Sequence, residues 1–179
     1  MPTYISMLRG INVSGQKKVL MEDLRKLYEL LGLKDVTTYI QSGNVVFTHP
    51  STNALELGSK IEKRIQQAFG FPVTVIMRTK EEFEKIIKNN PLVRKEDPKS
   101  LYVTFLSKVP VTTPMNDIEK AAQKSEKFVI ANKEIYLSCP KGYGKTKLSN
   151  MFFERKLNVS ATTRNWNTVL TLNTIAKDI

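Results

Sequence analysis

The segment 7–19, MLRGINVSGQKKV, combines residue types that could bind an anion. Arg9 and Lys17 bring positive charge, and Gly10 permits a sharp bend at which backbone N–H groups can approach a ligand closely. Asn12 adds an amide that can both donate and accept hydrogen bonds. Long loops in compact domains are commonly functional, so the sequence predicts an anion site here. A solvated connection with its basic residues in water is the alternative.

A second basic loop is predicted over residues 138–148, SCPKGYGKTKL. Lys145 and Lys147 precede a predicted helix, and the N-terminal N–H groups of a helix attract phosphate or carboxylate. The tripeptide GKT starting at Gly144 is also found in P-loops, but a P-loop needs a glycine five positions earlier, where this chain has Cys139. The sequence therefore predicts a glycine-bearing basic loop and not NTP hydrolysis. A solvated lysine-rich turn is the alternative.

The segment 161–168, ATTRNWNT, holds the only tryptophan of the chain. Arg164 could grip a carboxylate or phosphate through two parallel hydrogen bonds, and Trp166 could offer a face for stacking. Alternatively, Trp166 anchors the last helix to the core while Asn165 and Asn167 cap that helix. Arg164 is the functional candidate under both interpretations.

Catalytic groups are sparse in this chain. His49 is the only histidine and Cys139 the only cysteine, so neither a Cys-His dyad nor a metal or iron–sulfur site is expected, and no cofactor is predicted. Acidic pairs fall in the first turns of predicted helices, where the helix dipole explains them. The sequence leaves open whether the protein is an enzyme and identifies no catalytic residue.

Charge is the strongest compositional signal. Twenty-eight Lys and Arg against seventeen Asp and Glu give a net charge of +11, which favours anionic partners. A single cysteine cannot form an internal disulfide and fits the cytoplasm. The amino terminus lacks a secretion signal and no apolar run approaches membrane-spanning length, so no membrane association is expected. The oligomeric state is not indicated.

The elements that position these loops follow a repeated order. Strand, helix, strand, strand, helix, strand is the split βαβ or ferredoxin-like arrangement, and the second half repeats most of it. The predicted class is α+β, with two ferredoxin-like halves whose mixed or antiparallel sheets carry helices on one face. The predicted boundaries are a first half over 1–92, a linker over 93–98 and a second half over 99–179. Ser42-Gly43-Asn44 joins two predicted strands in a tight hairpin, for which Gly43 should adopt a positive φ.

Five segments together resemble the DUF1697 family: LRGINV at 8–13, LMEDLRKL at 20–27, TYIQSGNVVF at 38–47, KLSN at 147–150 and TTRNWNT at 162–168. This family is mostly bacterial and has no established biochemical function, so the resemblance implies an α+β fold and no activity. It also implies that the signature positions of the family are Arg9, Gly10, Asn12, Tyr39, Ser42, Gly43, Asn44, Lys147, Asn150, Arg164, Asn165 and Trp166.

The leading hypothesis is a cytoplasmic protein that binds an anion, either a nucleotide or a nucleic-acid backbone, in a basic cleft. This model expects Arg9 and Arg164 to lie close together. One alternative is a small-molecule enzyme acting on a phosphorylated or carboxylated substrate, with Ser42 or Tyr39 near the chemistry, and another is a scaffold without a ligand. The candidate ligand-binding residues are Arg9, Asn12, Tyr39, Ser42, Asn44, Lys145, Lys147, Asn150, Arg164 and Trp166.

Overall fold

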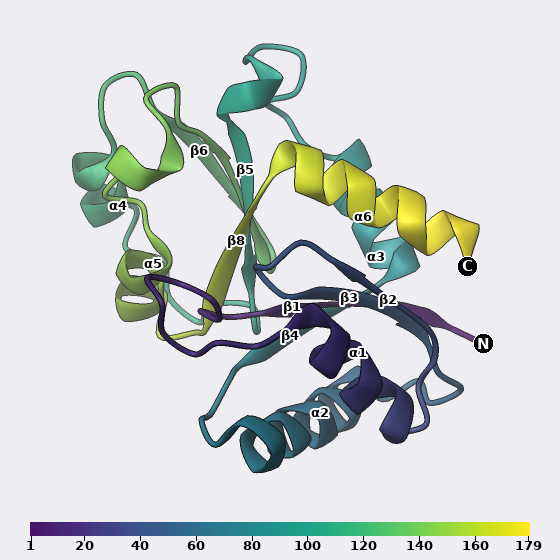
Figure 1. The fold of residues 1–179 in the computed structure, drawn as a ribbon. Coiled ribbons are helices and arrows are strands. Elements are labelled where there is room, and N and C mark those ends of the chain that lie inside the picture. Colours follow the sequence, from purple (N-terminus) through teal and green to yellow (C-terminus); the bar gives the residue numbers. More distant parts are fainter. The chain divides into compact units, whose positions relative to one another are not determined.

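The computed structural model describes residues 1–179 and contains two four-stranded antiparallel sheets with helices packed on them (Figure 1). The chain divides into two compact units. The first unit consists of Met1–Lys85 and Thr171–Ile179, and the second consists of Ile86–Leu170. Each unit contains one of the sheets, so the predicted α+β class with two ferredoxin-like halves is confirmed.

The first unit has the predicted order of strand, helix, strand, strand, helix, strand. The strand order in its sheet is β2-β3-β1-β4. Its elements are β1 (Thr3–Leu8), α1 (Met21–Leu30), β2 (Lys34–Tyr39), β3 (Asn44–Thr48), α2 (Ala54–Phe69) and β4 (Val75–Thr79), and α3 (Lys80–Lys88) begins directly after β4.

The second unit repeats this order, and its sheet has the equivalent strand order β6-β7-β5-β8. Two short 3-10 turns, η1 (Pro98–Ser100) and η2 (Tyr143–Lys145), lie in its connections. Its elements are β5 (Leu101–Leu106), α4 (Met115–Ala121), β6 (Lys127–Ala131), β7 (Glu134–Ser138), α5 (Asn150–Leu157) and β8 (Ala161–Asn165), and α6 (Trp166–Asp178) begins directly after β8.

The register of the central strands also repeats between the units. Ile5 of β1 lies opposite Arg78 of β4, and Val103 of β5 lies opposite Arg164 of β8. Tyr4 and Tyr102 therefore occupy equivalent positions, as do Ser6 and Thr104. This correspondence allows each site in one unit to be compared with a matched position in the other.

The helices of the first unit form because their apolar residues recur every three or four positions and so lie on one face. This face of α1 and α2 packs on the sheet around Tyr4, Leu8 and Phe47. Asn53 caps the start of α2 by accepting the N–H of Glu56, and Gly70 ends it with φ +82°. The buried helix residues are Leu24, Leu27, Tyr28, Leu57, Ile61 and Ile65.

The hairpin between β2 and β3 confirms the prediction for Gly43, which has φ +85°. A Cβ atom at this position would lie 2.6 Å from Cδ1 of Ile11 and 2.9 Å from Cβ of Leu8. The backbone of Gly43 also accepts the N–H of Leu8 over 2.8 Å. Only glycine satisfies both the left-handed conformation and this close approach.

Thr79 and Glu82 form a capping box at the start of α3. The N–H of Thr79 donates to Oε2 of Glu82 over 2.8 Å, and the N–H of Glu82 donates to Oγ1 of Thr79 over 3.2 Å. Residues 93–98, the predicted linker, lie within the second unit, in a series of turns that leads into η1. No helix of the structure is long and apolar enough to cross a membrane.

Candidate functional site

Asn12 holds the loop between β1 and α1 in place. Its Nδ2 donates to the carbonyl of Val19 over 2.9 Å and to that of Gln41 over 2.8 Å, while its Oδ1 accepts the N–H of Val19 over 2.8 Å. Asn12 adopts φ +53°, a conformation that asparagine tolerates better than most residues. The side chain expected to bind a ligand is thus engaged in joining this loop to α1 and to the hairpin.

The remaining candidates of the first unit lie near the same corner of the sheet. Asn44 is buried, and its Nδ2 donates to the carbonyl of Tyr39 over 2.9 Å and to Oγ of Ser42 over 3.0 Å. Arg9 is half-buried, and its backbone N–H donates to the carbonyl of Thr74 over 2.9 Å. The hydrogen bonds of the Asn44 side chain are explained by the structure of the hairpin. Five candidates therefore come together at this corner: Arg9, Asn12, Tyr39, Ser42 and Asn44.

His49 and Cys139, the only histidine and the only cysteine, lie in surroundings that do not favour catalysis. Nδ1 of His49 accepts the N–H of Ser51 over 3.1 Å within a turn. Cys139 is buried, and burial followed by the carboxylate of Glu126 raises the pKa of its thiol to about 12. A thiol that stays protonated at neutral pH is a poor nucleophile.

In the second unit, a polar cluster joins the loop before α5 to the sheet. Oδ1 of Asn150 accepts the hydroxyl of Thr163 over 2.6 Å and that of Tyr143 over 3.3 Å. The hydroxyl of Thr163 lies 2.7 Å from that of Thr104 and 3.1 Å from that of Tyr143. The backbone N–H of Asn150 donates to Oη of Tyr143 over 3.1 Å. Three side chains, those of Tyr143, Thr163 and Thr104, thus hold Asn150 in one orientation.

The position in the first unit that is equivalent to Thr104 is Ser6, and it is closed to solvent. There, Oγ of Ser6 lies 2.9 Å from Oη of Tyr28, and both residues are completely buried. In the second unit Tyr143 comes from a surface loop and remains half-buried, as does Asn150. Sequence analysis missed Tyr143, Thr163 and Thr104. The only available signal was an aromatic residue between two glycines in a basic loop.

Three exposed lysines lie close in sequence to Tyr143 and Asn150 of this half-buried cluster. We call residues Ser138–Leu148 the lysine loop, since Lys141, Lys145 and Lys147 all lie exposed in it and form no ion pair. No acidic residue occurs between positions 138 and 153. The second unit carries fifteen Lys and Arg against seven Asp and Glu, a net +8, whereas thirteen against ten leave +3 on the first. The positive charge is therefore concentrated in the unit that contains the lysine loop.

The structure does not place Arg164 with the lysine loop. Thr163 directs its side chain to the polar cluster, so Arg164, the next residue in β8, points to the opposite face of the sheet. The guanidinium donates to Oγ1 of Thr162 over 2.8 Å and to the carbonyl of Thr163 over 3.0 Å. Burial lowers the pKa of Arg164 to about 10, which leaves it charged at neutral pH. Its predicted proximity to Arg9 stays a prediction.

Trp166 opens α6 and is only 5% exposed. A ring so deeply buried has no free face for a nucleobase, which favours the anchoring interpretation over stacking. Asn165 supports this view, because its Oδ1 accepts the N–H of Thr168 over 2.8 Å and caps the helix.

The comparisons with known proteins agree with the fold and are silent on activity. The model of a family described as "Protein of unknown function (DUF1697)" matches residues 1–136. A solved structure of conserved bacterial protein SP0830 from Streptococcus pneumoniae is similar, with a TM-score of 0.74, 25% sequence identity and 98% of each chain covered. A search of curated proteins finds no match.

Proposed function

We propose that this chain, which belongs to the DUF1697 family, binds the phosphate groups of a nucleic-acid backbone or a nucleotide through its lysine loop. The observation that carries the proposal is the exposure of Lys141, Lys145 and Lys147 without any ion pair in a loop free of acidic residues. Ammonium groups in such a place attract phosphate by charge and donate hydrogen bonds to it.

Asn150 supports the proposal by adding a directed donor. Its Oδ1 accepts the hydroxyls of Thr163 and Tyr143, which turns its Nδ2 away from them, and Nδ2 has no protein partner. Asn150 is also the first residue of α5, whose positive dipole end favours a nearby anion. The Asn150 Nδ2 and the lysine ammonium groups are all hydrogen-bond donors, which suits the acceptor oxygens of phosphate.

An extended polyanion fits this loop better than a single buried phosphate does. The three lysines are spread over seven positions of a surface loop, and the whole unit has a net charge of +8. A nucleic-acid backbone gains from several such contacts, because each releases a condensed counterion. A cytoplasmic location is part of the proposal, supported by a single buried cysteine.

Fluorescence anisotropy with a labelled single-stranded DNA 20-mer at low salt tests the proposal. Changing all three lysines of the loop to alanine is expected to weaken binding by about tenfold or more, since about three phosphate contacts are lost. The matched control changes three exposed lysines that form no ion pair elsewhere in the chain, namely Lys63, Lys85 and Lys108.

The control variant has the same net charge and should retain most of its affinity. Equal losses in the two triple variants would mean that binding reflects overall charge, and the proposal would fail. Competition by ATP at concentrations where inorganic phosphate has no effect would identify a nucleotide as the better ligand.

A further inference from the structure

β2 forms an open edge of the sheet in the first unit. It pairs only with β3, and apart from the Asn44 side chain on the carbonyl of Tyr39, its backbone forms no hydrogen bond beyond that strand. Its residues are exposed or half-buried, whereas β4 at the other edge is largely buried. The unpaired N–H and C=O groups of such an edge can pair with another strand.

A bulge shapes this edge near its start. Lys34 lies opposite Thr48 and Thr37 opposite Val46, so β2 contains one extra residue in this interval. Asp35 within the bulge adopts φ +52°, and its Oδ2 accepts the hydroxyl of Thr48 over 2.7 Å. The bulge thereby fixes the direction of the Asp35 side chain.

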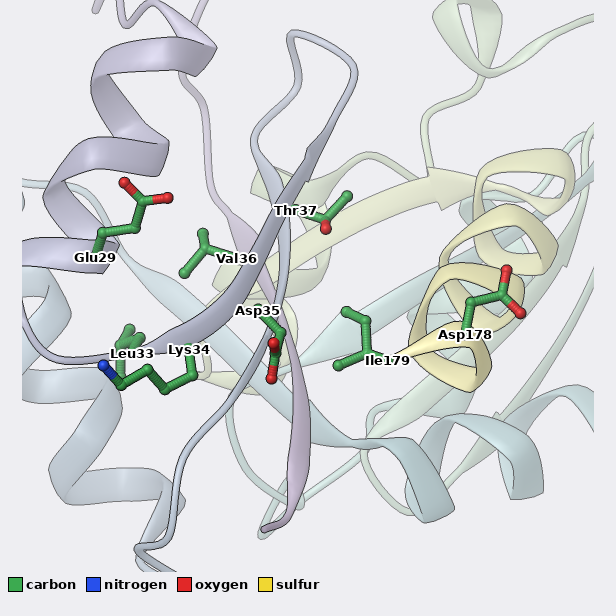
Figure 2. Close-up of a pocket in the computed structure, with 8 residues that line it drawn as sticks. All are labelled: Glu29, Leu33, Lys34, Asp35, Val36, Thr37, Asp178 and Ile179. Atoms are coloured by element: carbon green, nitrogen blue, oxygen red, sulfur yellow. The ribbon is translucent and has the colours of Figure 1, made fainter.

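A hollow of about 700 Å³ runs along this edge, and we call it the β2 groove (Figure 2). Figure 2 shows side chains on both sides of β2, with Leu33 and Val36 toward α1 and Asp35 toward the end of α6. Because the lining comes from both faces of the strand, the hollow follows the strand edge itself. Its lining residues are Glu29, Leu33, Lys34, Asp35, Val36, Thr37, Asp178 and Ile179.

The groove differs in charge from the rest of this basic protein. It contains three carboxylates and one ammonium, in a chain whose net charge is +11. Glu29 is paired with Arg25 over 2.6 Å, whereas Asp178 has no partner and Asp35 contacts only the Thr48 hydroxyl. Two carboxylates on the α6 side of β2 are therefore available to a cation.

We propose that the β2 groove binds an extended segment of a partner protein in which apolar and basic residues alternate, by adding it as a fifth strand to the sheet. Backbone hydrogen bonds to β2 would supply affinity, as in other cases of strand addition. Side chains alternate along a strand, so every second residue faces the α1 side of β2, where Val36 is half-buried and Leu33 is already buried in the core. The residues between them face Asp35 and Asp178, where Lys or Arg completes the charge.

A fluorescent peptide of sequence KVKVKVKV is the probe, with binding measured by anisotropy. The peptide is expected to bind, and two controls should bind at least about tenfold more weakly, which corresponds to a loss of about 1.4 kcal/mol in binding free energy. The first control peptide has Glu in place of Lys. The second control peptide keeps Lys but has N-methyl groups on alternate residues, at the backbone nitrogens that would donate to β2. Equal binding of the N-methylated peptide would overturn strand addition.

Two double variants separate the groove from general charge. Asp35→Asn with Asp178→Asn should weaken binding of the Lys peptide at least about tenfold, because asparagine keeps the local geometry and removes the charge. Glu22→Gln with Glu56→Gln makes the same change of net charge on α1 and α2, outside the groove, and should leave binding unchanged. A similar loss in both double variants, or no binding of any peptide, would overturn the proposal.

A second copy of this chain is the other molecule that could pair with the open edge of β2. Sedimentation velocity on the wild type and on the Asp35→Asn, Asp178→Asn variant distinguishes it. Self-association that this variant abolishes would replace the partner segment by a second copy and overturn the proposal, whereas monomers in both cases support it. Failure here leaves the lysine loop untouched, since the two sites lie in different units.

Discussion

Asn12 and Gln41 are joined by a hydrogen bond of 2.8 Å from the side-chain Nδ2 to the backbone carbonyl. Two further bonds connect the same side chain to the backbone of Val19. One asparagine thus connects the loop after β1, the start of α1 and the tip of the β2–β3 hairpin. These hydrogen bonds hold together the corner that contains five of the candidate residues.

Asn12→Ala should lower the free energy of unfolding by about 2–4 kcal/mol, measured by urea denaturation. Three hydrogen bonds worth about 1 kcal/mol each are lost, and alanine adds strain at φ +53°. Asn12→Gly loses the same bonds without the strain and should cost about 1 kcal/mol less. Values for both variants within experimental error of wild type would show that the loop does not depend on Asn12.

Gly43→Ala should destabilise the protein by about 2–4 kcal/mol, because the new Cβ collides with Ile11 and Leu8 in addition to the cost of its positive φ. Gly70→Ala is the matched control, with φ +82° and no atom within 4 Å of the added Cβ. It should cost only about 1 kcal/mol. Equal losses of stability in the two variants would contradict the close approach at Gly43.

Tyr143→Phe should destabilise the second unit by about 1–2 kcal/mol in thermal or urea unfolding. It removes the hydroxyl that accepts the N–H of Asn150 and leaves that donor without its partner. Tyr39→Phe is the control, since the Tyr39 hydroxyl makes no hydrogen bond. A neutral result for Tyr143→Phe would mean that the polar cluster does not position Asn150.

Cys139 should react slowly with a thiol reagent at pH 8 in the native protein and rapidly in concentrated urea. Burial raises the pKa of its thiol to about 12, and burial likewise raises the pKa of Tyr136 to about 12. Because both groups hold their protons more tightly when folded, the stability they contribute is complete below pH 9 and declines between about pH 9 and 12. Native reactivity as fast as that in urea would contradict the burial of Cys139.

Much of the fold can be predicted from the sequence, because the periodicity of apolar residues and the residues typical of turns indicate the strands and helices. The Ser42-Gly43-Asn44 hairpin is an example in which one local signal was enough to predict the structure. The bulge at Asp35 in β2, by contrast, has no distinct sequence pattern.

The candidate site was less accessible to sequence reasoning. Residue type alone could not show that the side-chain amides of Asn12 and Asn44 donate hydrogen bonds to backbone carbonyls, or that Trp166 is buried. Arg164 and Thr163 point to opposite faces of β8, and a difference of one residue decides which of them meets the lysine loop. Tyr143 joined the site through contacts with Thr163, twenty positions away. Such pairings arise from tertiary structure.

The salt dependence of DNA binding tests the role of the lysine loop most directly. The logarithm of the association constant for a single-stranded 20-mer is plotted against the logarithm of the salt concentration for wild type and the two triple lysine variants. Loss of Lys141, Lys145 and Lys147 should reduce the magnitude of the slope by about two, since about 0.7 counterions are released per phosphate contact on a single strand. The control triple variant should keep the wild-type slope. An unchanged slope in a folded lysine-loop variant would contradict phosphate binding at this loop.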